Sequence, residues 1–295
     1  MRAFEYIAAK DSRHAVALLA EYGAAAKVLA GGTDLLVELK AAPHVPQMVI
    51  DISRAEDLQN IALTDEGLSI GALVTHTAIM RSPLIREMFP ALVDAAHTIG
   101  AVQTRNLGTL GGNLVTGVPS MDSGPTLVAL EALVIILGPA GRRQLPLADF
   151  FTGPRKTALK PDELLAEIVI PKKNLGKPVH FLKFGLRKGQ ALALVNVAAS
   201  LRVDWDKQLC IAPRIALGAV APTVIRATQA EAYLEGRAIT PEAMAEAGRI
   251  AAGEAKPISD FRASAGYRRD LIAVLTQRAV DGAYALAKAK RDQEA

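Results

Sequence analysis

Two glycine pairs, far apart in the chain, are the residues whose type and spacing could perform chemistry. One pair lies in residues 30–35 (AGGTDL) and the other in residues 109–113 (TLGGN). Glycine lets the backbone adopt a positive φ and lets another group lie directly against the main chain. A run of free backbone N–H groups between small side chains is typical of an anion or phosphate site. Either segment alone could be an ordinary turn, but two such loops in one chain predict one extended ligand held between them.

The first glycine pair is preceded by a predicted strand and followed by a predicted helix. Apolar residues at 26–29 indicate a short buried strand, and a helix begins within residues 34–39. A helix at 12–22 and a strand at 48–52 complete a small βαβαβ unit in the first 55 residues. A helix that begins directly after a glycine turn places N–H groups and the positive end of the helix dipole together. The pattern therefore predicts a seat for a pyrophosphate group.

The second glycine pair lies in a longer segment of mixed strands and helices. The residue pattern predicts helices at 76–80 and 85–96 before the pair, which is itself predicted as a loop. Another loop is expected at 149–153. The predicted strands of this segment are 58–61, 68–72, 133–137, 143–146 and 163–170.

A polar segment bounded by prolines, residues 172–178, predicts the main domain boundary. Three antiparallel strands followed by helices then predict a compact C-terminal domain. The single cysteine, Cys210, falls on the return of a hairpin in an apolar setting, which indicates a structural role. The predicted elements are strands at 180–184, 193–203 and 214–220 and helices at 227–235, 241–253 and 264–289.

The composition excludes several classes of function. The chain has 295 residues, of which 51% are hydrophobic and 22% are charged, as expected for two or three globular domains. The net charge of +4 is dispersed, which argues against a nucleic-acid partner. One cysteine excludes a disulfide framework and a cysteine-ligated cluster within this chain. No apolar run is long enough for a membrane span, and the N-terminus lacks a signal-peptide pattern, so a cytoplasmic location is expected.

No familiar catalytic motif is present. The G-x-G of Rossmann folds, the P-loop and the G-x-S-x-G elbow are all absent from the sequence. The five histidines are scattered and show no metal-ligand spacing. We therefore predict no catalytic residue and no metal ligand in this chain.

Several segments together resemble the FAD-binding subunits of molybdenum hydroxylases, the medium subunits of the xanthine, carbon monoxide and nicotinate dehydrogenase type. The segments are AGGTDLL at 30–36, QTRNLGTLGGNL at 103–114 and PSMDSGP at 119–125. Similar segments continue to residue 271, so the resemblance covers essentially the whole chain in order.

This resemblance implies an α+β fold in three parts. Two α/β subdomains, residues 1–55 and 56–174, form an FAD-binding domain of the PCMH (vanillyl-alcohol-oxidase) type. Residues 175–295 form a C-terminal domain with a three-stranded antiparallel sheet and a helix bundle, of the type found in CO dehydrogenase flavoproteins.

The resemblance also implies which residues hold FAD. The first loop would wrap the pyrophosphate, and the second would close on it from the other side. Asp122 would bind the adenosine or ribose end, Ile99 and Leu165 would line the flavin, and Lys183 would stabilise negative charge on the reduced ring. From the residues alone, Asp122 could instead cap a turn, Lys183 could face solvent, and Ile99 and Leu165 could be core. The implied residues are Val28, Leu29, Ala30, Gly31, Gly32, Thr33, Asp34, Leu35, Ile99, Thr109, Leu110, Gly111, Gly112, Asn113, Asp122, Leu165 and Lys183.

The partners implied by the resemblance are a large molybdopterin-binding subunit and a small subunit with two [2Fe–2S] clusters, expected in a dimer of heterotrimers. This chain would pass electrons from the clusters through FAD to NAD⁺, a quinone, oxygen or another acceptor. One alternative is a stand-alone reductase resembling the UDP-N-acetylenolpyruvoylglucosamine type, which would need its own substrate domain. Another is an assembly module that has lost its flavin, for which the intact glycine pairs would be unnecessary.

Overall fold

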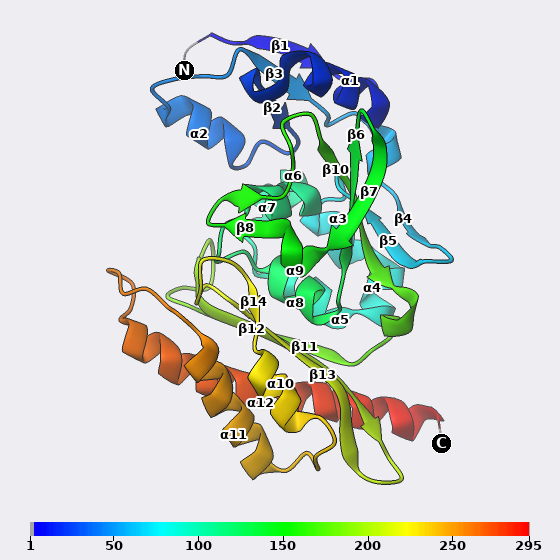
Figure 1. Ribbon diagram of the computed structural model, residues 1–295, viewed down its shortest axis with the longest axis vertical. Helices are drawn as coiled ribbons and strands as arrows, with labels where there is room; N and C mark the ends of the chain where they lie inside the picture. The colour runs from blue at the N-terminus through cyan, green and yellow to red at the C-terminus, as the bar shows by residue number, and fades with distance from the viewer. Residues whose placement is uncertain (1–2, 295) are drawn as a thin grey trace.

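The computed structural model describes residues 3–294 and shows three layers stacked along the long axis of the molecule (Figure 1). An N-terminal lobe, residues 5–51, lies at one end, and a middle lobe, residues 61–171, follows it. A C-terminal domain, residues 179–294, lies at the other end. Within residues 3–294, no helix combines the length and the apolar character needed to cross a membrane.

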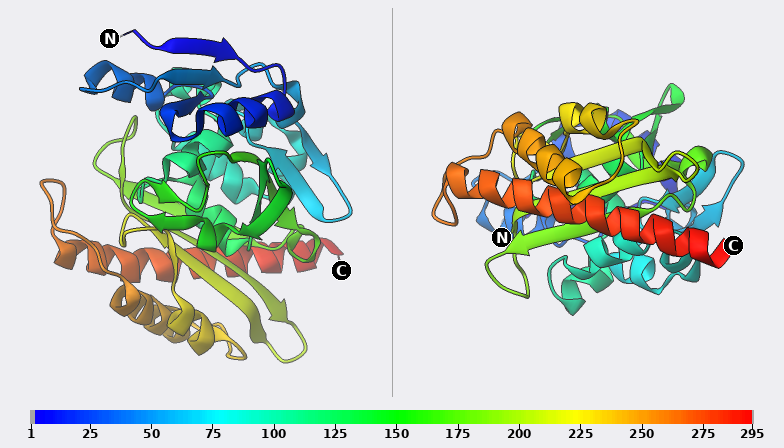
Figure 2. Two further views of the ribbon diagram at one scale, coloured as in Figure 1. Left: turned by 45° about the horizontal axis from the view of Figure 1, so that its top comes forward. Right: turned by 90° about the horizontal axis from the view of Figure 1, so that it is seen from below.

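The N-terminal lobe is a three-stranded parallel sheet with two helices. Its elements are β1 Glu5–Ala8, α1 Ser12–Tyr22, β2 Ala26–Leu29, α2 Leu35–Ala41 and β3 Met48–Asp51, with the strand order β1-β3-β2. The predicted βαβαβ order is confirmed. Asp11 caps α1, and its side chain accepts the N–H of His14 at 2.7 Å. Helix α1 lies between this sheet and the middle lobe (Figure 2).

The middle lobe is a five-stranded antiparallel sheet packed against short helices. Its strands are β4 Ile61–Leu63, β5 Gly67–Gly71, β6 Leu133–Gly138, β7 Gly141–Pro146 and β10 Leu164–Pro171, in the order β4-β5-β10-β6-β7. Its helices are α3 His76–Arg81, α4 Pro83–Met88, α5 Pro90–His97, α6 Val102–Leu107, α7 Leu110–Thr116, α8 Ser123–Ala129 and α9 Leu147–Phe150. A small hairpin pairs β8 Phe151–Gly153 with β9 Lys156–Thr157. Apolar residues of β5, β6 and β10 form one core with these helices.

Three details of the middle lobe correct the prediction. The helix predicted at 85–96 is interrupted at Phe89, because Pro90 cannot donate a backbone hydrogen bond and starts a new helix. The loop predicted at 149–153 contains the end of α9 and strand β8. The strand predicted at 58–61 begins only at Ile61, after a 3₁₀ turn at Glu56–Leu58.

The C-terminal domain is a four-stranded antiparallel sheet with helices on its outer face. Its elements are β11 Val179–Gly185, β12 Ala193–Asp204, β13 Leu209–Gly218, β14 Ile225–Arg226, α10 Thr228–Leu234, α11 Pro241–Glu254 and α12 Ala265–Glu294. Figure 2 shows α11 and α12 crossing that face. The strand β14 corrects the predicted three-stranded sheet, since two residues are too short to show an alternating pattern.

Strand β13 begins at Leu209 rather than at residue 214, so Cys210 lies within the sheet. Its thiol is buried, and burial raises the pKa to about 12. A thiol with so high a pKa carries little thiolate at neutral pH, which agrees with the predicted structural role.

The middle lobe and the C-terminal domain share one hydrophobic core. Both faces of β12 are buried, because Ala198 packs toward the middle lobe while Val197 and Ala199 pack toward the outer helices. Every residue of α8 is buried, and α8 lies against β12 and β13. Packing therefore fixes the C-terminal domain beside the segment that carries the second glycine pair.

Candidate functional site

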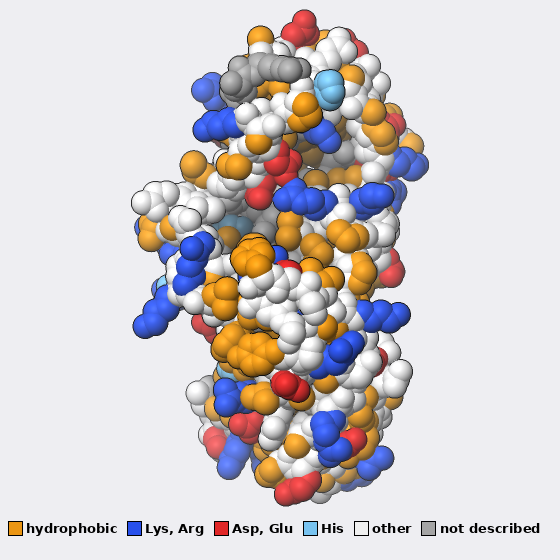
Figure 3. Space-filling view, turned by 90° about the vertical axis from the view of Figure 1, so that its left-hand side faces the viewer, with side chains coloured by type: hydrophobic (Ala, Val, Ile, Leu, Met, Phe, Trp, Pro, Cys, Tyr) orange, Lys and Arg blue, Asp and Glu red, His pale blue; other side chains and the backbone are white. Residues whose placement is uncertain are grey.

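A cavity opens between the N-terminal lobe and the middle lobe, and both glycine pairs line it. We call it the main cavity; it encloses about 950 Å³, including its open mouth. The space-filling view shows the molecule hollowed between these two lobes (Figure 3). The predicted site residues that line it are Val28, Ala30, Gly31, Gly32, Thr33, Asp34, Leu35, Ile99, Thr109, Gly111, Gly112, Asn113 and Leu165.

The first glycine loop, residues 30–35, connects the end of β2 to the start of α2. Gly32 has a φ of +70°, in the region that favours glycine. In the part of the chain that the structure describes, the backbone N–H groups of residues 31–35 donate to no acceptor. These five N–H groups, which we call the amide cradle, lie at the positive end of the α2 dipole. They can therefore hold a phosphate or another anion.

Gly31 is needed for the close approach of two segments. A Cβ at this position would lie 1.8 Å from the carbonyl oxygen of Leu107, at the end of α6. Real Cβ atoms essentially never come closer than 3.0 Å to such an atom, so a side chain here would push the loop away from α6. The first glycine loop is thus held directly against the segment that leads into the second.

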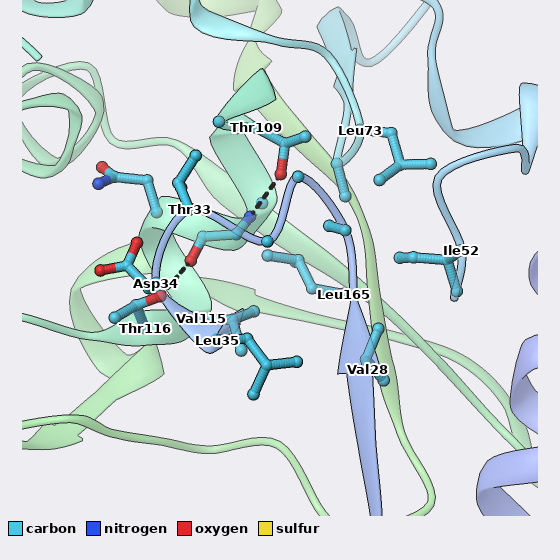
Figure 4. A pocket seen from close by; sticks show the side chains of 18 of the residues that line it. Val28, Thr33, Asp34, Leu35, Ile52, Leu73, Thr109, Val115, Thr116 and Leu165 are labelled. Carbon is cyan, nitrogen blue, oxygen red and sulfur yellow. Dashed lines mark hydrogen bonds between the residues drawn. The ribbon is translucent and has the colours of Figure 1, made fainter. Parts of the chain in front are cut away.

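The second glycine pair forms a helix and not the predicted loop. Residues 110–116 are α7, and Thr109 caps it, its hydroxyl accepting the N–H of Gly112 at 3.0 Å (Figure 4). Glycine lowers helix propensity, so the composition predicted a loop. The cap and the surrounding packing outweigh that preference.

The amides at the start of α7 are used inside the protein. The N–H of Leu110 donates to the carbonyl of Val74, and the N–H of Gly111 donates to the carbonyl of Ala72, both at 2.9 Å. A Cβ on Gly111 would lie 2.6 Å from the Cβ of Ala72, so this glycine serves helix packing. The second segment therefore offers side chains to a ligand, whereas the first offers amides.

The main cavity has a polar end and an apolar end (Figure 4). Hydroxyl and carboxylate groups gather near the first loop, and branched aliphatic side chains lie on the opposite side. The polar end carries Thr33, Asp34, Thr109 and Thr116, and the apolar end carries Val28, Ile52 and Leu73.

Sequence reasoning missed eleven residues of the cavity wall. Two of them, Thr104 and Gly108, lie inside the segment 103–114 that carries the resemblance, so that segment could have identified them. The others come from elements whose place at the cavity depends on tertiary packing. The missed residues are Ile52, Ala72, Leu73, His76, Thr104, Gly108, Val115, Thr116, Leu159, Glu163 and Leu164.

A second cavity continues from the main one toward the C-terminal domain. It encloses about 870 Å³, and Thr33, Ile99 and Asn113 line both cavities. Its far end reaches Asp122 and residues 190–192, in the connection between β11 and β12. The two cavities therefore form one elongated cleft that touches all three layers of the molecule.

Asp122 and Lys183 form a buried ion pair beside the second cavity. Lys183 Nζ lies 2.5 Å from Asp122 Oδ2, and each side chain is only 7% exposed. Lys183 also donates to the carbonyl of Thr98 at 3.1 Å, and Asn196 donates to Asp122 Oδ1 at 3.0 Å. Burial raises the pKa of Asp122, against the opposing effects of Lys183 and Asn196. Lys183 therefore does not face solvent, which was the alternative reading of this residue.

Three predicted residues line neither part of the cleft. Lys183 lies behind Asp122, Leu110 is fully buried in the middle-lobe core, and Leu29 packs behind the first loop near Gly32. Ile99 lines both cavities, whereas Leu165 lines the main cavity and also belongs to the core.

The donors and the shape of the cleft fit a dinucleotide such as FAD. The unpaired amide cradle suits a diphosphate, since its N–H groups have no other acceptor in the described residues. The apolar end can accept a planar ring, and the carboxylate of Asp122 can accept hydrogen bonds from hydroxyl groups. The fold and the cleft together define an α+β nucleotide-binding protein that holds its ligand between lobes.

Comparison with known families identifies the protein more closely. Residues 2–173 match the family described as FAD binding domain in molybdopterin dehydrogenase. Residues 180–283 match the CO dehydrogenase flavoprotein C-terminal domain. The chain therefore belongs to the family of FAD-binding oxidoreductase subunits of the CO and xanthine dehydrogenase type.

Individual relatives agree with this membership over nearly the whole chain. The chain is 35% identical to the carbon monoxide dehydrogenase medium chain of Hydrogenophaga pseudoflava, over 96% of this chain and 97% of that one. The crystal structure of that dehydrogenase lacking the Mo-pyranopterin moiety of its molybdenum cofactor superimposes with a TM-score of 0.92, covering 97% and 98% of the two chains. Quinoline 2-oxidoreductase from Pseudomonas putida 86 gives a TM-score of 0.89 at 30% identity, covering 97% and 99%.

Proposed function

We propose that the chain holds FAD along the cleft and serves as the electron-transfer subunit of a molybdenum hydroxylase. FAD supplies the redox chemistry when it is bound, while this chain binds it, orients it and shields it from water. Electrons arrive from two [2Fe–2S] clusters of a small partner subunit and leave to an external acceptor. The substrate is oxidised at a molybdopterin centre on a large partner subunit.

The amide cradle is the observation that carries the proposal. None of these five consecutive N–H groups has an acceptor among the described residues: those of Asp34 and Leu35 stand at the start of α2, where unpaired amides are normal, but those of residues 31–33 precede the helix. A diphosphate would supply acceptors for several of them at once. An assembly module that had lost its flavin would gain nothing from keeping these donors unpaired.

Nine of the seventeen residues that the resemblance implies have specific roles in this proposal. The amide cradle holds the diphosphate, Asp122 binds the ribose or adenosine end, and Lys183 holds the carboxylate of Asp122 in place. Ile99 and Leu165 line the flavin. The proposed division of the chain is 1–55, 56–174 and 175–295, with FAD between the first two parts.

The partner subunits are proposed from the relatives and from the surface. The relatives are named as a medium chain, an FAD-subunit and a subunit of a dehydrogenase complex. A large apolar side chain is exposed at the second cavity, at Leu192, and others are exposed at Leu186 and at Phe261, which is 94% exposed. Exposed apolar groups of this kind are typical of surfaces that bind another protein. We propose a dimer of heterotrimers as the assembly.

An absorbance spectrum of the purified chain from about 300 to 600 nm, followed by heat release and identification of the chromophore, tests the FAD assignment. We expect released FAD in a stoichiometry near one per chain, or its uptake on addition to the colourless protein. A chain that neither retains nor takes up FAD, alone or co-expressed with partners, would refute the proposal. Co-purification with molybdopterin and iron–sulfur subunits separates the proposed role from a stand-alone reductase, which would be active alone.

A further inference from the structure

His76 is a buried side chain in the wall of the main cavity that the proposed function has not used. It is the first residue of α3, and its backbone N–H donates to the carbonyl of Gly108 at 3.0 Å. The residue is only 2% exposed, and it lines the main cavity. The backbone bond thus ties the start of α3 to the segment between α6 and α7.

The imidazole ring of His76 has no hydrogen-bond partner among residues 3–294. Its Nδ1 atom is fully buried and unpaired, and neither ring nitrogen takes part in a side-chain hydrogen bond. Buried polar groups in native structures are paired in the great majority of cases. Neither ring nitrogen is therefore committed to a protein partner in this part of the chain, and a nitrogen at the cavity wall is free to bind a ligand.

One edge of the ring faces the amide cradle. A Cβ built on Gly108 would lie 3.4 Å from Cδ2 of His76 and 3.6 Å from the hydroxyl oxygen of Thr33. His76 and Thr33 thus both border the space beside Gly108, and Thr33 contributes its N–H to the amide cradle. Nε2 adjoins Cδ2 in the ring, so it lies on this side, whereas Nδ1 lies on the other side and is buried.

The protonation of the ring makes Nε2 a donor. Burial, together with the charge of Arg105, lowers the pKa of His76 to about 4, so the ring is neutral at pH 7. A neutral imidazole carries one N–H and one lone pair. A buried N–H without an acceptor is rarer in native structures than a buried acceptor without a donor. Since Nδ1 of His76 is buried and unpaired, it carries the lone pair, and Nε2 carries the hydrogen.

We propose that His76 is a further contact of the bound FAD, with its Nε2–H donating to an oxygen of the diphosphate beside the N–H of Thr33. This inference rests on the proposed function. Several groups around this point can donate, namely the cradle amides, the Thr33 hydroxyl and the imidazole N–H, and they outnumber the one carboxylate of the first glycine loop, that of Asp34. An acceptor-rich group such as a diphosphate matches that set, whereas a ribose, which also brings hydrogens, matches it less well.

Binding measurements on the full chain test this contact. FAD binding is measured by flavin fluorescence, ADP binding by competition, and riboflavin serves as a flavin without a diphosphate. We expect His76→Phe, which keeps a ring but has no donor, to weaken binding of FAD and ADP by about 10- to 100-fold and to leave riboflavin binding unchanged. His76→Gln, whose amide can donate from a similar position, restores part of the affinity.

His180 provides a matched control. Its Nδ1 is also buried and unpaired in the described chain, but it packs against Gly282 and lines neither cavity of the cleft. We expect His180→Phe to bind FAD as the wild type does. In ¹⁵N spectra of histidine-labelled protein, addition of FAD should shift the Nε2 resonance of His76 and leave the ring of His180 unchanged.

The outcomes separate this inference from the proposed function. A wild-type chain that takes up no FAD refutes the proposed function and the contact together. A wild-type chain that binds FAD while His76→Phe binds it equally well refutes only the contact with His76. Equal losses for FAD and riboflavin would show that the ring only supports the cavity wall, and this result would also overturn the inference.

Discussion

Replacing Gly31 with alanine should separate the first glycine loop from α6 and weaken FAD binding strongly. The new Cβ would lie 1.8 Å from the carbonyl oxygen of Leu107, so the loop must retreat by about 1.6 Å to reach an ordinary contact of 3.4 Å. A hydrogen bond of about 2.9 Å lengthened by that amount is no longer a hydrogen bond. Loss of two cradle bonds to a charged phosphate, at about 1.5–3 kcal/mol each, weakens binding by about 10²- to 10⁴-fold.

Fluorescence titration with FAD measures the loss, and urea denaturation shows whether the fold survives. The overpacking itself should lower the free energy of unfolding by only about 1–3 kcal/mol. Gly253→Ala is the control, because Gly253 lies in α11 with no atom within 4 Å of the new Cβ. That control should gain up to about 1 kcal/mol of stability from helix propensity and keep its FAD affinity. Unchanged affinity in Gly31→Ala would refute the reasoning, since the cradle would then tolerate a displaced loop.

Two further predictions concern the contacts between the middle lobe and the C-terminal domain. Burial alone would raise the pKa of Glu131, but the hydrogen bond from Asn174 and the charge of Arg214 lower it to about 2. The ionised carboxylate of Glu131 therefore stabilises the fold above pH 4.5. Urea denaturation should show that the free energy of unfolding decreases as the pH falls from 4.5 toward 2. The Glu131→Gln variant should lack this contribution at all pH values. Lys183→Met should lower the free energy of unfolding by about 3–5 kcal/mol because it leaves the charge of Asp122 buried and unpaired, and adding Asp122→Asn should recover most of the loss. A loss below about 1 kcal/mol in Lys183→Met is the value typical of a solvent-exposed ion pair, and it would contradict the burial of this pair.

The first glycine loop could be predicted from sequence because its signals are local. A buried strand, a glycine turn and a helix start follow each other within residues 26–39, and the structure contains them as β2, the loop and α2. The ion pair of Lys183 is different. The alternation of β11 places its side chain on one face of a strand, but only the packing of that strand beside Asp122 decides that the face is buried.

The remaining features depend on contacts between distant segments. Gly111 and Gly112 favour a loop by composition, yet the packing of Gly111 on Ala72 and the cap by Thr109 produce a helix. A single histidine such as His76 carries no pattern in sequence, because its importance comes from burial at a cavity wall. The break at Pro90 was visible in the sequence, since proline is favoured as the first residue of a helix.

The shared core between the middle lobe and the C-terminal domain has a consequence for synthesis of the protein. Helix α8 ends at Ala129, but the strands and side chains that cover it extend to Val224. At about 5–20 residues per second, a ribosome needs about 5–20 s to make the intervening chain. During this interval the apolar surface of α8 lacks its cover, so a nascent chain stalled near residue 175 would present that surface to chaperones. A gene divided at residue 175 would express a first half with the same exposed surface, which only the second half can cover.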